Sequence, residues 1–195
     1  MKEIIICVDK NDKEIGFIEK MDAHIRGILH RAISVFIFND NKELLLQKRF
    51  SGKYHSPSLW TNTCCTHPNK GEKTKDAANR RLKEEMGFST DIDEVFSFIY
   101  YVKFDNELIE HEFDHVFFGK YNGSINFNTN EVENYKWISL NELKKDIKLN
   151  PQIYTFWFIY IMNNHINEIA KYLDTINYEI MCSISDRVDR KYIEE

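Results

Sequence analysis

The sequence contains little proline and glycine, with 3 Pro and 7 Gly among 195 residues. Low-complexity tracts and flexible linkers are rich in these residues or in serine, and the chain has no such stretch and no internal repeat. We therefore expect a single domain over residues 1–195, large enough for one well-packed core.

Long apolar stretches are also absent. A membrane-spanning helix needs about 20 consecutive apolar residues, and no run in this sequence approaches that length. The first residues, MKEIIICVDK, reach charged side chains too soon to form a secretory signal. These absences exclude a membrane protein, and we expect a cytoplasmic location with no membrane partner.

Cysteine is scarce, which argues against a secreted disulfide framework. Of the 4 cysteines, Cys64 and Cys65 are adjacent and cannot readily form a disulfide with each other. At least one cysteine is therefore a candidate for chemistry rather than for cross-linking.

Basic residues are outnumbered, since 26 Lys and Arg stand against 31 Asp and Glu for a formal charge of -5. Proteins that bind nucleic acid without sequence preference usually carry a net positive charge, so we expect no nucleic-acid partner. Any anionic ligand must be held by a local basic patch. Aromatic residues are plentiful, with 14 Phe, 10 Tyr and 3 Trp, and indicate an aromatic interior.

The first part of the chain is typical of short strands. Residues 3–8 and 15–18 flank a turn-like segment and predict a hairpin. Residues 32–38 and 44–47 flank Asn39-Asp40-Asn41 and predict a second antiparallel pair.

After these predicted strands, the spacing of apolar residues changes to that of a helix. Apolar and small residues recur at helical spacing from Lys75 to Met86, and Gly87 stands where a helix C-terminus is expected. The remaining elements are predicted as strands at 95–104, 112–121 and 135–138, a turn at 122–123, helices at 140–146 and 151–165, and a C-terminal helical extension or tail over 166–195.

The densest group of reactive side chains is Trp60-Thr-Asn-Thr-Cys-Cys-Thr-His-Pro68. Three interpretations stay open: buried structural cysteines, a reactive thiol, and a structural zinc site that includes His67. An extended chain sends Cys64 and Cys65 to opposite faces, so both cannot easily face one ion together with His67.

A second group is Glu110-His-Glu-Phe-Asp114. On a strand, Glu110, Glu112 and Asp114 share one face and repel one another unless a cation lies among them. A solvated edge is one interpretation. Neighbouring apolar residues favour partial burial instead, and buried carboxylates need a metal or a basic partner.

Further candidate ligands are His24 and His30, which precede the strand predicted at 32–38. A single histidine is usually a surface residue or one whose hydrogen bonds are satisfied. Together with His67, Glu110 and Glu112, however, they form a set suited to zinc, manganese or magnesium.

The helix at 75–86 carries Arg80, Arg81, Glu84 and Glu85. Ion pairing along the helix surface is the simplest interpretation. The functional alternative is that one carboxylate faces inward and holds Mg²⁺ on a diphosphate. Three other basic residues are candidates for phosphate binding: Lys20, Arg49 and Lys53.

At these motifs the chain resembles the type I isopentenyl-diphosphate isomerases of the Nudix superfamily. The similarity covers about residues 3–162. The matching segments are Ala23-His24, Gly27-Ile-Leu-His-Arg-Ala32, Gln47-Lys-Arg49, Trp60 to Pro68, the helix with Glu72, Arg80, Glu84, Glu85 and Gly87, Glu110 to Asp114, and Tyr154-Thr-Phe-Trp157. The resemblance implies an α+β Nudix fold, with mixed β-sheets sandwiched between helices and extra N-terminal strands, and a Nudix-like core over about 28–162.

The resemblance also implies an activity, the interconversion of isopentenyl and dimethylallyl diphosphate by a 1,3-allylic proton shift. Cys65 and Glu112 then correspond to the acid–base pair, and Tyr100 to the tyrosine that assists the acid. Trp157 corresponds to the indole that covers the hydrocarbon and stabilises a carbocation through its π face. Which of Cys65 and Glu112 gives the first proton stays open.

Two metal sites and a phosphate site follow from the same correspondence. His24, His30, His67, Glu110 and Glu112 would surround one Zn²⁺ or Mn²⁺ per subunit. Glu85 and the carbonyl of Cys65 would hold Mg²⁺ with the diphosphate. The expected substrate-binding residues are Lys20, Arg49, Lys53, Thr66, Arg81 and Trp157. The implied partner is a small prenyl diphosphate, and the chain is expected to be a monomer or a homodimer.

Several positions depart from the family patterns. Arg81 stands where the general Nudix pattern has Glu, and this exchange favours binding a diphosphate intact over cleaving it. Thr66, Ser58 and Phe156 stand where the isomerases usually have Ser or Gly, Gly, and Pro. A Nudix hydrolase is the alternative function, and a non-catalytic metal-binding domain is a third.

Overall fold

Strand β3 (His30–Phe38) lies at the centre of the fold. The structure is a computed structural model and describes residues 3–53, 55–104 and 106–176. Along its whole length β3 pairs in parallel with β8 (Ile109–Lys120), which occupies one edge. Its other edge is therefore shared by β1 (Ile4–Val8), β6 (Cys64–Thr66) and β4 (Glu43–Arg49), all antiparallel to it. This arrangement brings segments far apart in sequence against one strand.

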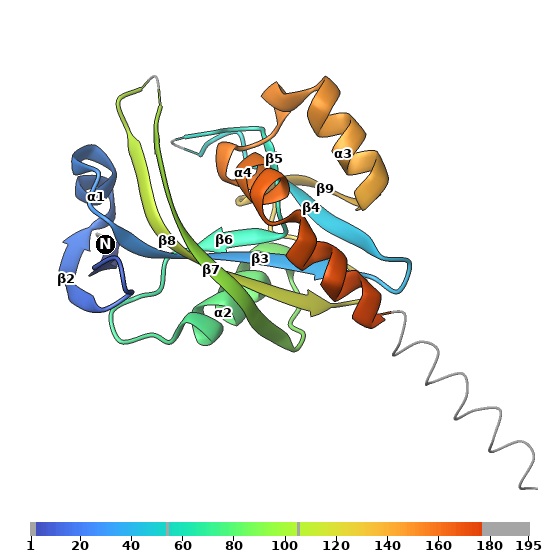
Figure 1. Cartoon of the computed structure of the whole chain (residues 1–195), viewed down its shortest axis with the longest axis horizontal. Helices are drawn as coiled ribbons and strands as arrows, with labels where there is room; N and C mark the ends of the chain where they lie inside the picture. Colours follow the sequence, from blue (N-terminus) through green and yellow to red (C-terminus); the bar gives the residue numbers. More distant parts are fainter. Residues whose placement is uncertain (1–2, 54, 105, 177–195) are drawn as a thin grey trace, which may run out of the picture.

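The antiparallel partners predicted from alternation are confirmed. β1 pairs with β2 (Glu14–Glu19), and β3 joins β4 through the turn at Asn39. The later strands are β5 (Trp60–Thr61), β7 (Ile92–Lys103) and β9 (Val132–Ser139). β5 and β9 both pair with β4, and β7 forms a long hairpin with β8 (Figure 1).

Two apolar clusters cover the two faces of the sheet. Val35 and Ile37 of β3 face α2 (Thr74–Met86), which contributes Leu82. The alternate residues Phe36 and Phe38 belong to the other cluster. That cluster includes side chains of α3 (Leu140–Leu149), α4 (Phe156–Asn164) and the helical residues 166–176. The predicted α+β sandwich of a mixed sheet between helices is thus confirmed (Figure 1).

The predicted end of α2 at Gly87 is also confirmed. Gly87 has φ 77°, in the left-handed region, and its N–H bonds to the carbonyl of Lys83. A Cβ at this position would lie 2.1 Å from the carbonyl oxygen of Asn126. Glycine is therefore required both by the backbone conformation and by the close approach of a second chain segment.

The single helix predicted at 151–165 is wrong. A short 3₁₀ turn, η1 (Pro151–Ile153), comes first, and α4 begins only at Phe156. Between them Tyr154 forms a bridge with Trp60, and the N–H of Thr155 donates to the carbonyl of Trp60. Pairing with another strand thus competes successfully with local helical propensity.

A short helix in the first part of the chain was not predicted. α1 (Lys20–Arg26) begins after Glu19, whose carboxylate accepts from the N–H of Asp22, and ends at Gly27 with φ 63°. Its seven residues are too few for a clear helical period in the sequence. α1 matters because Lys20 and His24 lie one helical turn apart on it.

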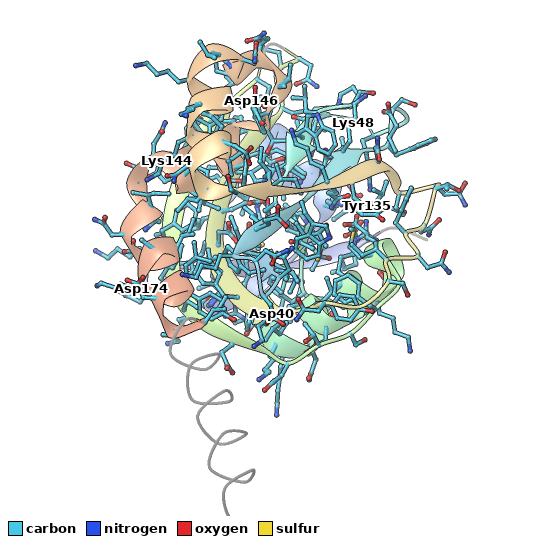
Figure 2. The ribbon with its side chains drawn as sticks, turned by 90° about the vertical axis from the view of Figure 1, so that its right-hand side faces the viewer. Asp40, Lys48, Tyr135, Lys144, Asp146 and Asp174 are labelled. Carbon is cyan, nitrogen blue, oxygen red and sulfur yellow. The ribbon has the colours of Figure 1, made fainter. Side chains whose placement is uncertain are left out.

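Charged side chains such as Lys144 and Asp174 lie on the outer sides of the C-terminal helices (Figure 2). Within the ranges that the structure describes, no helix combines the length and apolarity needed to cross a membrane. Residues 166–176 form a helix that buries Ile169 and Ile176. The part of the expected C-terminal extension at 177–195, with Cys182, lies outside the described residues.

Candidate active site

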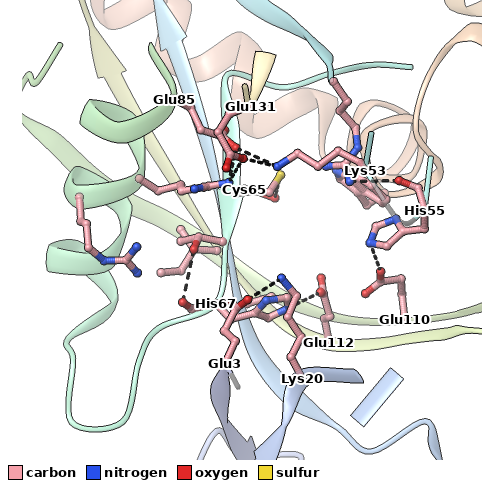
Figure 3. Close-up of a pocket in the computed structure, with 18 of the residues that line it drawn as sticks. Glu3, Lys20, Lys53, His55, Cys65, His67, Glu85, Glu110, Glu112 and Glu131 are labelled. Carbon is pink, nitrogen blue, oxygen red and sulfur yellow. Dashed lines mark hydrogen bonds and ion pairs between the residues drawn. The ribbon is translucent and has the colours of Figure 1, made fainter. Parts of the chain in front are cut away.

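A polar cavity of about 460 Å³ opens where β3, β6 and β8 meet α2 and the loop that follows β4 (Figure 3). It brings together residues that the sequence separates by more than a hundred positions. Those predicted residues that line it are Lys20, Arg49, Lys53, Cys65, Thr66, His67, Arg81, Glu85, Glu110, Glu112 and Trp157. His24, His30 and Tyr100 are buried beside it and contact its wall.

The position of Glu112 follows from the register of three strands. On β8 it lies opposite His30 of β3 on one side and opposite Tyr100 of β7 on the other. Tyr100 Oη donates to Glu112 Oε2 at 2.6 Å, and His67 Nε2 lies 3.0 Å from Glu112 Oε1. The predicted shared face of Glu110, Glu112 and Asp114 is buried, so the solvated-edge interpretation is wrong.

Three histidines converge beside this carboxylate. His30 Nε2 and His67 Nε2 are 3.2 Å apart, and the His24 and His30 ring centroids are 5.0 Å apart. His30 Nδ1 lies 2.7 Å from the carbonyl oxygen of Ile28, which assigns the proton to Nδ1 and leaves Nε2 as a lone-pair donor.

Candidate ligand atoms of His24, His30 and His67 lie within 4.8 Å of one another, as do those of His30, Glu110 and Glu112. Nitrogen and oxygen donors in this number fit a divalent cation. His30 Nε2 and His67 Nε2 are 3.2 Å apart, close enough for both nitrogens to bind one cation. The predicted ligand set is therefore brought together in space.

Burial sets the protonation of these groups. It lowers the pKa of His24 to about 4, with help from His67 and His30, and it lowers the pKa of His67. Burial alone would raise the pKa of Glu112, but the adjacent His30 and His67 side chains hold it well below its usual range. Burial and the Glu112 charge raise the pKa of Glu110. Neutral imidazoles and an ionised Glu112 are the forms that bind metals.

Cys64 and Cys65 point to opposite faces of β6, as the sequence predicts. Cys64 is fully buried in the cluster with α2, whereas Cys65 lines the cavity. The thiol of Cys65 donates to Asn62 Oδ1 at 3.3 Å and lies 3.7 Å from Ser34 Oγ. Burial, followed by the nearby Asp114, raises the pKa of Cys65 to about 12, so the thiol is protonated at neutral pH.

The basic side of the cavity contains paired charges. Arg81 Nη2 lies 2.6 Å from Glu85 Oε1 and 2.7 Å from Glu131 Oε2, and Lys53 pairs with Glu131 as well. Gln47 Nε2 donates to Glu85 Oε2 at 2.7 Å. The ion pairs along the surface of α2 are confirmed, and Glu85 faces inward into the cavity (Figure 3). That Glu85 holds Mg²⁺ stays a prediction.

The apolar wall is formed by Trp157 at the start of α4. Its indole N–H donates to Thr61 Oγ1 at 3.0 Å, and only 4% of the residue is exposed. The guanidinium of Arg49 lies 5.2 Å from the ring centroid. An apolar surface and a guanidinium cation are therefore adjacent in one cavity.

Comparison with known proteins agrees with this geometry. The NUDIX domain pattern matches residues 28–158. Isopentenyl-diphosphate Delta-isomerase 2 of Aromatoleum aromaticum is 51% identical over 157 residues, which are 80% of this chain and 83% of that protein. Isopentenyl-diphosphate Delta-isomerase 2 of Photorhabdus laumondii is 50% identical over 84% of this chain and 92% of its own length. The chain belongs to the isopentenyl-diphosphate Delta-isomerase family of Nudix proteins.

Solved structures show the same fold at greater distance. DR0079 from Deinococcus radiodurans superposes with a TM-score of 0.64 at 20% identity, over 76% of this chain and 90% of that one. A MutT protein from Methanosarcina mazei superposes with a TM-score of 0.54 at 17% identity, over 77% and 94%. These likenesses concern the fold alone.

This chain departs from the isomerase pattern at Ser58 and Phe156. At both positions the backbone conformation explains why the family usually has glycine or proline there. Ser58 has φ 57°, in the left-handed region that glycine adopts without strain. Phe156 is the first residue of α4 after its N-cap Thr155, the helical position at which proline is favoured. Neither side chain lines the cavity, although the Phe156 ring lies 6.3 Å from that of Tyr100, measured between centroids.

Several residues of the site were not predicted from the sequence. Glu131 and His55 line the cavity, and Asn62 and Ser34 contact the thiol of Cys65. Asn62 stands inside the Trp60 to Pro68 motif and His55 two positions after Lys53, so their positions in the chain were a usable signal. Ser34 and Glu131 give no such signal, since only tertiary pairing brings them to the site.

Proposed function

We propose that the chain interconverts isopentenyl and dimethylallyl diphosphate by a 1,3-allylic proton shift within this cavity. One observation carries the proposal: Cys65 and Glu112 line a single cavity whose wall also includes an indole and several basic side chains. Identity of about one half to named isomerases over most of the chain supports the same activity.

The reaction requires two proton transfers at different carbons. A group adds a proton to the terminal alkene carbon, which leaves positive charge on the tertiary carbon, and another group removes a proton from the carbon on the far side of that centre. The two groups must therefore flank the substrate. We assign them to Cys65 and Glu112, which lie apart along the cavity in Figure 3. The reversible reaction uses the pair in both directions.

The hydrogen bond from Tyr100 orients Glu112 toward the substrate, because it holds Oε2 in one place. Trp157 covers the hydrocarbon, and its π face stabilises developing positive charge by about 2 kcal/mol in a desolvated site. The buried aromatic wall also excludes water, which would otherwise add to the carbocation and yield an alcohol.

His24, His30, His67, Glu110 and Glu112 are the residues that would hold a Zn²⁺ or Mn²⁺ ion, and Glu85 with the Cys65 carbonyl would hold Mg²⁺. Such ions, when bound, supply positive charge that keeps Glu112 in place and neutralises the diphosphate. The nearby nitrogen and carboxylate atoms support the first assignment, and the inward Glu85 supports the second.

Lys20, Arg49, Lys53, Thr66 and Arg81 are proposed to bind the diphosphate. All of them line the cavity. Guanidinium and ammonium groups form charge-assisted hydrogen bonds with phosphate oxygens. Because Arg81 replaces a hydrolase carboxylate, the cavity holds the diphosphate without cleaving it.

The test is incubation of the metal-loaded protein with isopentenyl diphosphate, followed by NMR of the organic product and a phosphate assay. We expect dimethylallyl diphosphate and no inorganic phosphate. Release of phosphate with no change in the alkene would support a hydrolase instead. Cytoplasmic location and oligomeric state stay predictions from sequence.

A further inference from the structure

His55 lies in the segment between β4 and β5, and its side chain points toward Glu110 (Figure 3). His55 Nε2 is 3.1 Å from Glu110 Oε1, and the exposed fractions of the two side chains are 10% and 4%. The other carboxylate oxygen of Glu110 lies 3.4 Å from His24 Nδ1. Glu110 therefore lies between two imidazoles, of which only His24 belongs to the expected metal ligands.

Aromatic neighbours fix the orientation of the His55 ring. Phe104 stacks on it with a centroid distance of 5.9 Å and an interplanar angle of 15°. Trp157 meets it at 83° with the centroids 5.7 Å apart. A ring held on these sides keeps few rotamers, so Nε2 stays directed at Glu110.

The backbone around His55 is tied to the basic side of the cavity. Arg49 Nη2 donates to the carbonyl of His55 at 3.2 Å, and Arg49 Nε donates to the carbonyl of Ser56 at 3.1 Å. Through these bonds the segment that carries His55 is fixed against a residue proposed to bind phosphate. His55 thus links that segment to the metal-binding carboxylate.

We propose that His55 is a positioning residue: its Nε2–H donates to Glu110 and holds that carboxylate in the orientation needed to bind the divalent cation. The proposal rests on the metal site proposed above. Hydrogen bonds of this kind fix ligand orientation, and their loss typically weakens metal binding by about 10- to 100-fold.

The test measures Mn²⁺ and Zn²⁺ affinity by competition with a chelator, on purified folded protein without substrate. We expect His55→Ala to weaken binding by about 10- to 100-fold and to lower kcat more than it changes KM. His55→Gln should recover most of the affinity, because its amide N–H reaches the place that Nε2–H occupies. His165→Gln is the matched control, since His165 also stacks on an aromatic ring, Phe96, but lies outside the cavity.

A coupling measurement asks whether His55 acts through Glu110. In a Glu110→Gln background, His55→Ala should produce little further loss of affinity, because the carboxylate it positions is gone. Equal losses in both backgrounds, or wild-type affinity in His55→Ala, would overturn the proposal. If the wild-type protein binds neither ion, the proposed metal site itself is wrong. If the wild-type protein binds metal and His55→Ala binds it with the same affinity, only the role of His55 is wrong.

Discussion

Tyr100 and Glu112 face each other across β7 and β8, and the tyrosine hydroxyl donates to the carboxylate at 2.6 Å. Burial, together with the charge on Glu112, raises the pKa of Tyr100 well above its usual value, so the hydroxyl stays a donor at any working pH. Antiparallel register alone sets this pair, and it joins a residue proposed to do chemistry to one that orients it.

Tyr100→Phe should lower kcat by about 10- to 100-fold, which corresponds to the loss of a hydrogen bond to a charged group worth about 1.5 to 3 kcal/mol. KM should change little, because the hydroxyl contacts Glu112 rather than phosphate. Steady-state kinetics test this, with Tyr101→Phe as control, since Tyr101 is 57% exposed. An unchanged kcat in Tyr100→Phe would remove the hydroxyl from the mechanism.

Adjacent cysteines on opposite faces give a second comparison. Cys65→Ala should reduce turnover by at least about 100-fold, the lower range for loss of a general acid or base, with folding and metal content near wild type. Cys64→Ala should instead keep activity and lower Tm by about 2 to 4 °C for a loss of about 1 kcal/mol in a chain of this size. Calorimetry and turnover assays on both variants check this, and a fully active Cys65→Ala would contradict it.

Lys53 and Lys48 are both paired with a glutamate, Glu131 and Glu133 respectively, but only Lys53 lines the cavity. Lys53→Met should raise KM for isopentenyl diphosphate by about 10-fold or more, since a charge-assisted contact to phosphate is lost. Lys48→Met should leave KM unchanged because exposed ion pairs contribute little. Equal KM values for the two variants would contradict the assignment of Lys53.

Removal of the metal is expected to act on both stability and turnover. Treatment with a strong chelator should lower Tm, since an ion that binds only the folded state stabilises it by mass action. Adding back Mn²⁺, Zn²⁺ or Mg²⁺ one at a time should identify the ions that restore activity. His67→Ala should lose bound metal by elemental analysis, and undiminished occupancy would exclude His67 as a ligand.

Asp146 gives a pH-dependent prediction away from the cavity. Its carboxylate accepts from Tyr154 Oη at 2.6 Å and from Asn150 at 2.7 Å, and these bonds lower the pKa of Asp146. A lowered folded-state pKa stabilises the protein above the unfolded value of about 3.9, and this stabilisation is lost as pH falls through the folded value. Asp146→Asn should therefore destabilise at pH 7 and match wild type more closely in acid, as measured by urea unfolding. A difference that stays constant with pH would contradict this.

The sequence alone allowed much of the fold to be predicted, because alternation and helical spacing are local properties of the chain. The strands ending at Phe38, the helix ending at Gly87 and the opposite orientation of Cys64 and Cys65 all follow from local geometry. The break before Phe156 does not, since Thr155 bonds to the distant Trp60. The helix α1 was not predicted, because its seven residues are too few to show a helical repeat of apolar side chains.

The functional site likewise has features that follow from local sequence and features that follow only from tertiary structure. Residue types and their spacing indicated candidates for a reactive thiol, for metal binding and for phosphate binding, and the resemblance to the isomerases implied the acid–base pair. Only the tertiary structure decided that His30, Tyr100 and Glu112 stand in register on three strands, and that His55 reaches Glu110. Strand pairing and loop placement join residues far apart in the chain, and their energies depend on contacts that no local pattern contains.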